Sequence, residues 1–146
     1  MIEQLIEKWH LHLEGKLPGG LDELLADHVE FYSPVVFTPQ KGKMLTKIYL
    51  AAAGNTFNSE SNTEQKQNSM NVSDSSFHYT KEVLSGNYAV LEFETELEGK
   101  YINGVDIITC NNEGKIIEFK VMVRPLQAIN LLHQKMKAML EQMQKG

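Results

Sequence analysis

The sequence predicts an α+β fold in which N-terminal helices pack against a curved antiparallel sheet, and a further helix ends the chain. Three observations favour it: apolar residues have helical spacing at the start, alternate with polar residues over 77–124, and return to helical spacing after Pro125. Helices, then strands, then a helix is an α+β order. A chain of 146 residues, of which 42% are hydrophobic, predicts one domain over 1–146.

The first part of the chain predicts three helices and one strand. The helix over 2–15 has an apolar face made of Ile2, Leu5, Ile6, Trp9 and Leu13. A short second helix over 21–27 follows the break at Pro18-Gly-Gly, and residues 28–33 alternate as in a strand. A third helix is expected over 43–57. Residues 58–69 are almost wholly polar and predict a mobile loop within the domain.

The second part predicts an antiparallel meander with strands over 77–84, 88–97, 101–110 and 115–124. Short glycine-containing turns separate these strands, as in hairpins. The strand over 88–97 places glutamates on one face and apolar residues on the other. The last helix carries an apolar stripe rich in methionine, a residue that suits adaptable apolar contacts.

Asp106 is the residue that carries chemistry, if any residue does. Strand alternation gives it the same face as Ile102, Gly104, Ile108 and Cys110. A carboxylate on an apolar face is costly unless it is paired, hydrogen-bonded or protonated, and burial raises its pKa toward the range of a proton donor. Gly104 leaves room for a close neighbour or a ligand. The alternative is a structural acid that accepts hydrogen bonds from a loop or pairs with Arg124.

Composition excludes several classes of function. The net charge of −5, with Arg124 as the one arginine and scattered lysines, argues against nucleic-acid binding. One cysteine, Cys110, excludes an intrachain disulfide and a cysteine-based zinc site, and the histidines have no metal-ligand spacing. No metal or cofactor is expected. The sequence shows neither a signal-peptide pattern nor a long apolar run, so we expect a cytoplasmic protein with no membrane segment.

Two stretches resemble the NTF2-like, SnoaL-like superfamily: GVDIITCNNEGKIIEF over 104–119 and HVEFYSPV over 28–35, which follows a helix-turn-helix start. The order of elements is similar along nearly the whole chain. The resemblance implies a cone-shaped fold, in which a strongly bent sheet wraps around helices and leaves a pocket inside. It also implies a homodimer paired through the outer face of the sheet. Functions in this superfamily range from isomerases and cyclases to non-enzymatic binding domains, so fold alone does not give function.

The functional residues that the resemblance implies can be assigned to this chain only position by position. Ketosteroid isomerases are similar in layout, but the position of their general-base aspartate holds Ser33, and that of their helix tyrosine holds Trp9. Their protonated aspartate falls on Asp106, so one of three functional groups is kept. SnoaL-type polyketide cyclases use an acid/base aspartate in the strand of Asp106. Limonene epoxide hydrolases need two aspartates bridged by an arginine, and that triad is incomplete here.

The sequence therefore predicts binding of a small apolar molecule. The expected pocket residues, each of which is also ordinary core material, are Trp9, Ser33, Tyr49, Phe57, Asp106, Ile108, Phe119 and Val121. The alternatives are an isomerase or cyclase-like enzyme with Asp106 as acid/base, and a dimeric scaffold whose pocket is filled by side chains.

Overall fold

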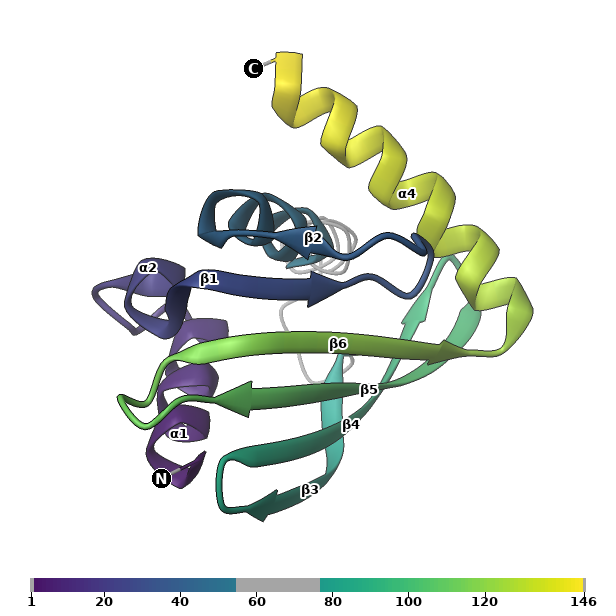
Figure 1. Ribbon diagram of the computed structural model, residues 1–146. Coiled ribbons are helices and arrows are strands. Elements are labelled where there is room, and N and C mark those ends of the chain that lie inside the picture. Colours follow the sequence, from purple (N-terminus) through teal and green to yellow (C-terminus); the bar gives the residue numbers. More distant parts are fainter. Residues whose placement is uncertain (1, 55–76, 146) are drawn as a thin grey trace.

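A curved six-stranded sheet is the centre of the computed structural model, which describes residues 2–54 and 77–145 (Figure 1). Its strand order is β2-β1-β6-β5-β4-β3. The strands are β1 (Leu25–Tyr32), β2 (Gln40–Lys41), β3 (His78–Ser85), β4 (Tyr88–Leu97), β5 (Lys100–Cys110) and β6 (Ile116–Arg124). The α+β class expected from the element order is confirmed.

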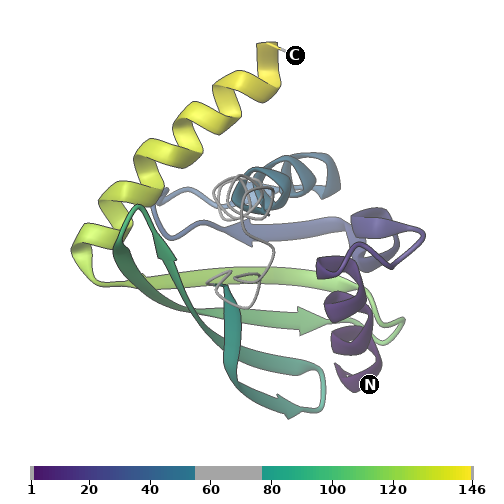
Figure 2. The ribbon, with the colours of Figure 1, turned by 180° about the vertical axis from the view of Figure 1, so that it is seen from behind.

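The helices lie around the edges and one face of this sheet. Helix α1 (Ile2–Leu13) and helix α2 (Gly20–Leu24) lie at one end of the strands, and α4 (Leu126–Lys145) begins at the other end and extends away from the sheet (Figures 1 and 2). A helical segment over 43–54 lies beside β1 and β2. The expected loop over 58–69 and the end of the third helix fall outside the described residues.

The short second helix ends earlier than the apolar spacing suggested. It stops at Leu24, because Leu25 already pairs with Ile116 at the start of β1. Residues Leu25 and Ala26 are buried in the sheet, which a helical continuation to Asp27 would have prevented.

Strands β3 to β6 form the expected antiparallel meander, but β1 joins β6 in parallel. Parallel neighbours need a long crossover connection, and here residues 33–115 lie between the two strands. The sheet is therefore mixed, with one parallel pair that local alternation cannot predict.

Two buried clusters hold the helices on the sheet. The larger joins α1, through Leu5, Ile6 and Trp9, to β1 and the inner faces of β4 to β6. The smaller joins Ala128 and Leu132 of α4 to Phe93 and its neighbours. In the part of the chain that is described, no helix is both long and apolar enough to cross a bilayer.

Candidate functional site

A cavity of about 600 Å³ lies on the inner face of the sheet, within the range of typical small-molecule sites. Its walls come from α1, the helical segment over 43–54, β3 and α4, and its floor from β4, β5 and β6. The lining is mainly apolar and includes six aromatic side chains, Trp9, Phe31, Phe77, Tyr79, Phe93 and Phe119. None of the described lining residues is a lysine or an arginine.

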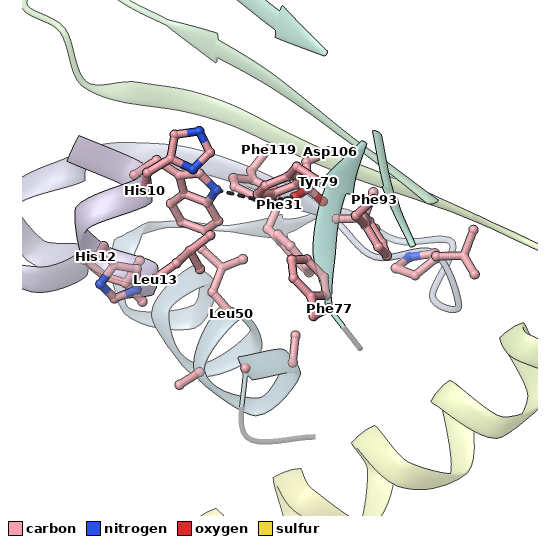
Figure 3. A pocket seen from close by; sticks show the side chains of 18 of the residues that line it. His10, His12, Leu13, Phe31, Leu50, Phe77, Tyr79, Phe93, Asp106 and Phe119 are labelled. Carbon is pink, nitrogen blue, oxygen red and sulfur yellow. Dashed lines mark hydrogen bonds between the residues drawn. The ribbon is translucent and has the colours of Figure 1, made fainter. Parts of the chain in front are cut away.

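Asp106 stands on this floor at the end of a chain of hydrogen bonds. Strand β5 places it between Leu91 of β4 and Val121 of β6, and its side chain is 6% exposed. Its Oδ2 accepts a hydrogen bond of 2.6 Å from the Tyr79 hydroxyl, which in turn accepts one of 3.0 Å from the Trp9 indole N–H (Figure 3). The chain thus links α1, β3 and β5, the elements that surround one end of the cavity.

The electrostatics of this pair follow from burial. Removal from water raises the pKa of Asp106 to about 7, although the hydrogen bond from Tyr79 opposes the shift. Burial, followed by the nearby Asp106 carboxylate, raises the pKa of Tyr79 far above its ordinary value. Tyr79 therefore keeps its proton and remains a donor, while Asp106 is poised between its neutral and charged forms near pH 7.

The two oxygens of the Asp106 carboxyl group have different surroundings. Oδ2 accepts from Tyr79, whereas Oδ1 has no hydrogen-bond partner among the described residues. When Asp106 is protonated, the proton therefore belongs on Oδ1. An acid in this state can donate to a polar atom of a molecule in the cavity, and an ionised one can accept.

The alternative pairing of Asp106 with Arg124 does not occur. Arg124 lies opposite Asn103 on the outer face of the sheet, and its Nη1 donates to Asn103 Oδ1 over 3.2 Å. Side chains alternate between the two faces along a strand, so residues three positions apart lie on opposite faces. Asn103 and Asp106 therefore lie on opposite sides of the sheet.

Gly104 makes room for an aromatic neighbour. A Cβ atom at this position would lie 2.5 Å from Phe93 Cζ and 2.7 Å from the Met122 carbonyl oxygen. Phe93 uses the space to cross β5, and it stacks on Phe77 with ring centroids 4.9 Å apart. The glycine therefore positions part of the aromatic wall of the cavity.

Tyr79 is the residue of this candidate site that alternation in the sequence missed, and a β-bulge is the reason. Tyr79 pairs with Phe93, but Lys81 pairs with Glu92, so β3 holds one extra residue at this point. A bulge of this kind moves the following side chains to the other face. Tyr79 faces inward before the bulge, and Glu82, opposite Leu91, faces inward after it, where it binds His10 of α1 at 2.5 Å. The pair of aromatic residues at 77 and 79 is the sequence signal that was available.

Of the expected pocket residues, four line the cavity: Trp9, Asp106, Phe119 and Val121. Trp9 packs on Phe119 with ring centroids 5.2 Å apart, so this pair forms a continuous wall beside Asp106. Phe57 falls outside the described residues.

Three other expected residues do not line the cavity, and their placement there is corrected. Ser33 lies in the turn after β1, where its Oγ accepts a hydrogen bond from the Val35 N–H over 3.1 Å. Tyr49 packs against Phe31 from the helical segment, in the core behind the cavity wall. Ile108 faces inward as expected, but it is fully buried in the larger core cluster.

Metal ligands are not grouped here. Within the described residues, no three histidine, cysteine, aspartate or glutamate side chains come together as a metal site would require. The polar groups of the cavity suit hydrogen bonding to an organic molecule instead.

Comparisons with known proteins bear on the fold. No family model matches the sequence, and no curated protein matches it. Among solved structures, a steroid delta-isomerase from Pseudomonas aeruginosa has a TM-score of 0.80 at 23% identity, covering 99% of this chain and 95% of that one. A Mesorhizobium loti NTF2-like protein of unknown function has a TM-score of 0.63 at 14% identity over 85% of this chain and 91% of its own. A Sinorhizobium meliloti protein, provisionally assigned as a polyketide cyclase, has a TM-score of 0.55 at 10% identity over 82% and 94%.

These similar structures establish the fold of the chain. The chain has the cone-shaped α+β fold of the NTF2-like, SnoaL-like superfamily, as the motifs over 28–35 and 104–119 indicated. All three identities are below 25%, so the likeness extends to the fold and not to the activity of any one neighbour.

Proposed function

We propose that this chain binds a small, mainly apolar molecule in the cavity and holds one polar atom of it at Asp106. The observation that carries the proposal is Asp106 Oδ1, an oxygen of a buried acid that has no partner among the described residues and stands in the wall of an apolar cavity. A bound molecule with one suitable polar atom would give Oδ1 a hydrogen bond inside an apolar cavity, where such a bond is stronger than in water.

The preferred polar atom is a carbonyl oxygen. The pKa of Asp106 is raised to about 7, so the protonated acid is well populated at neutral pH and can donate from Oδ1. Tyr79 occupies Oδ2, which fixes the direction of that donation. No lysine or arginine among the described lining residues offers a counter-charge, which disfavours an anionic ligand.

The cavity argues against a scaffold with a filled pocket. A volume of about 600 Å³ is large enough for a molecule with several rings, whereas voids larger than a water molecule are few in ordinary cores. An isomerase or cyclase-like role for Asp106 is the second candidate, because an acid with a pKa of about 7 is suited to proton transfer. If turnover of a substrate were found and survived Asp106→Asn, that second candidate would be wrong.

A pair of two-ring probes tests the binding function. Bicyclohexyl is wholly apolar, and cyclohexyl-cyclohexanone adds one carbonyl oxygen at the end of the same skeleton. We expect both to raise the melting temperature of the wild-type protein, and calorimetry to show a gain from the carbonyl below pH 7 of about 3- to 10-fold, the effect of one hydrogen bond. Failure of both probes to bind would contradict the proposal.

Two substitutions of Asp106 make the test specific. Asp106→Leu should abolish the gain from the carbonyl and keep binding of the hydrocarbon. Asp106→Asn should keep the gain, because its amide oxygen can accept from Tyr79 while its amide N–H donates to the ketone. An unchanged carbonyl gain in Asp106→Leu would remove Asp106 from the proposal and leave only the apolar cavity.

The outer face of the sheet supports pairing of two copies. Tyr88 and Val90 of β4, Tyr101 of β5 and Met122 of β6 are exposed by 36–61% on that face. These side chains are spread along three neighbouring strands, with Glu92 and Glu94 of β4 between them on the same face, so a second copy would meet both apolar and charged groups. We propose a homodimer through this face, and Met122→Glu should shift the mass measured by light scattering from dimer to monomer. A wild-type monomer at micromolar concentration would contradict this pairing.

A further inference from the structure

His12 is a polar side chain of the cavity wall that the hydrogen-bond chain at Asp106 does not use. It belongs to the last turn of α1 and lines the cavity beside Leu13 and Leu21. Its imidazole ring packs on the Trp9 indole, with centroids 5.6 Å apart. Neither ring nitrogen has a hydrogen-bond partner among the described residues.

The two other histidines of the wall differ from His12 in this respect. His10 is bound to Glu82, and His78 lies 3.8 Å from Glu94. Glu82 occupies one imidazole nitrogen of His10, and the contact of His78 with Glu94 is an ion pair when His78 is protonated. Among the described histidines of the wall, His12 is the one with neither a hydrogen bond nor an ion pair at its ring nitrogens.

His12 and Asp106 lie at the two ends of the Trp9 side chain, so a single molecule in the cavity could contact both. Trp9 lies between them: its N–H points to Tyr79 and Asp106, and its ring packs on His12. Figure 3 shows His12 and Asp106 at opposite ends of this row of side chains, with Leu13 and Leu50 between them on the cavity side. A molecule lying along the indole would reach the acid at one end and the imidazole at the other.

We propose that His12 is a second ligand-binding residue and that the molecule carries a hydroxyl-type polar group at the end opposite the one held by Asp106. This inference rests on the proposed binding function and specifies its ligand: an apolar, ring-sized body with a polar atom at each end. A neutral imidazole has one donor and one acceptor nitrogen, so it pairs well with a hydroxyl group, which can also do both. Burial lowers the pKa of His12, which keeps the ring neutral at pH 7.

The test adds one hydroxyl group to the ketone probe. The compounds are cyclohexyl-cyclohexanone and its analogue with a hydroxyl on the far carbon of the second ring. Their affinities for the full-length protein are measured by calorimetry at pH 7. In the wild type, we expect the hydroxyl to strengthen binding about 3- to 10-fold, the contribution of one hydrogen bond.

Substitutions at His12 test whether the gain in affinity from the hydroxyl group comes from this residue. His12→Phe keeps an aromatic ring on the Trp9 indole but has no nitrogen, so the gain from the hydroxyl should vanish while the simple ketone binds as before. His12→Gln restores a donor and an acceptor and should recover part of the gain. The matched control is His28→Phe, an exposed histidine on β1 that does not line the cavity, and it should behave as the wild type.

The outcomes separate the two proposals. A hydroxyl gain that is absent in the wild type, or that persists in His12→Phe, overturns the role of His12 and leaves binding at Asp106 intact. If neither compound binds to the wild type, the proposed binding function fails and the role of His12 fails with it. A gain that is present in the wild type and His28→Phe, lost in His12→Phe and partly recovered in His12→Gln supports the role of His12.

Discussion

Replacing Asp106 with asparagine should stabilise the protein above neutral pH and change little in acid. Burial raises the pKa of Asp106 from 3.8 to about 7, which is roughly three pKa units. Each unit corresponds to about 1.4 kcal/mol, so ionised Asp106 costs the native state up to about 4 kcal/mol. Asparagine is nearly the same size and keeps an oxygen that accepts from Tyr79, but it never has to ionise.

The direction of the pH dependence follows from proton binding. Because the native state holds the proton of Asp106 more tightly than the unfolded chain does, the stability from this group is fully present below about pH 4. It is lost progressively as the pH rises from there through about 7. The asparagine variant lacks this loss, so the difference in unfolding free energy between the two proteins should grow over that window and level off above it.

Urea unfolding at several pH values between about 4 and about 9 measures this difference. Trp9 is the single tryptophan of the chain and reports unfolding from within the site by its fluorescence. The matched control is Asp27→Asn, because the Asp27 side chain is 97% exposed and its 3.6 Å contact with Lys43 is a surface ion pair, whose loss should change the unfolding free energy by less than about 1 kcal/mol. A difference for Asp106→Asn that is constant across the range would refute the argument that Asp106 is buried and poised near neutral pH.

Three further substitutions test the surroundings of this acid. Tyr79→Phe removes two buried hydrogen bonds, so the free energy of unfolding should fall by about 1–3 kcal/mol. The pKa of Asp106 should rise further, because the hydrogen bond that lowers it is lost. The pH at which ketone affinity falls should therefore shift upward. Gly104→Ala places a Cβ atom 2.5 Å from Phe93, and the overpacking should cost about 1–3 kcal/mol in urea unfolding. Val121→Phe fills part of the cavity floor and should weaken binding of the two-ring ketone at least about 10-fold by calorimetry, the effect of displacing buried apolar contact.

Each of these substitutions has a matched control elsewhere in the chain. Tyr88→Phe keeps the ring on the outer face and removes a hydroxyl group that has no hydrogen-bond partner among the described residues, so it should leave stability unchanged. Gly54→Ala, at the rim of the helical segment that lines the cavity, meets no atom of the described residues within 4 Å and should not destabilise. Val90→Phe lies on the outer face and should not affect ketone binding. Equal effects in a substitution and its control would mean that the site is not responsible for the change.

The inner face of the sheet could be predicted because its signal is local. Along β4 and β5 every second side chain meets the core, so alternation identified both the buried Leu91 and the buried Asp106. The same reasoning placed Trp9 on the apolar face of α1. These assignments need no knowledge of which strands are neighbours.

Tyr79 could not be predicted in this way, because its position depends on a defect in the pairing. Ser85 pairs with Tyr88 across the hairpin, and regular counting back along β3 would set Tyr79 opposite Glu94, a residue of the outer face. The bulge sets it opposite Phe93 instead, on the inner face. The parallel direction of β1 was hidden for a related reason: the pattern over 28–33 indicates a strand but carries no information about its neighbour.

The contrast between Asp106 and Ser33 is what favours binding over isomerisation. The resemblance to ketosteroid isomerases requires a donor that polarises a carbonyl group and a base that removes a proton on the opposite side of the substrate. In the proposed site, Asp106, which is linked by hydrogen bonds to Tyr79 and through it to Trp9, would supply the donor. Ser33 stands where the base would be, but it does not line the cavity, and its Oγ accepts a hydrogen bond from the Val35 N–H. Asp106 can hold a carbonyl compound and polarise it, whereas moving a proton between two carbon atoms would need a base other than Ser33.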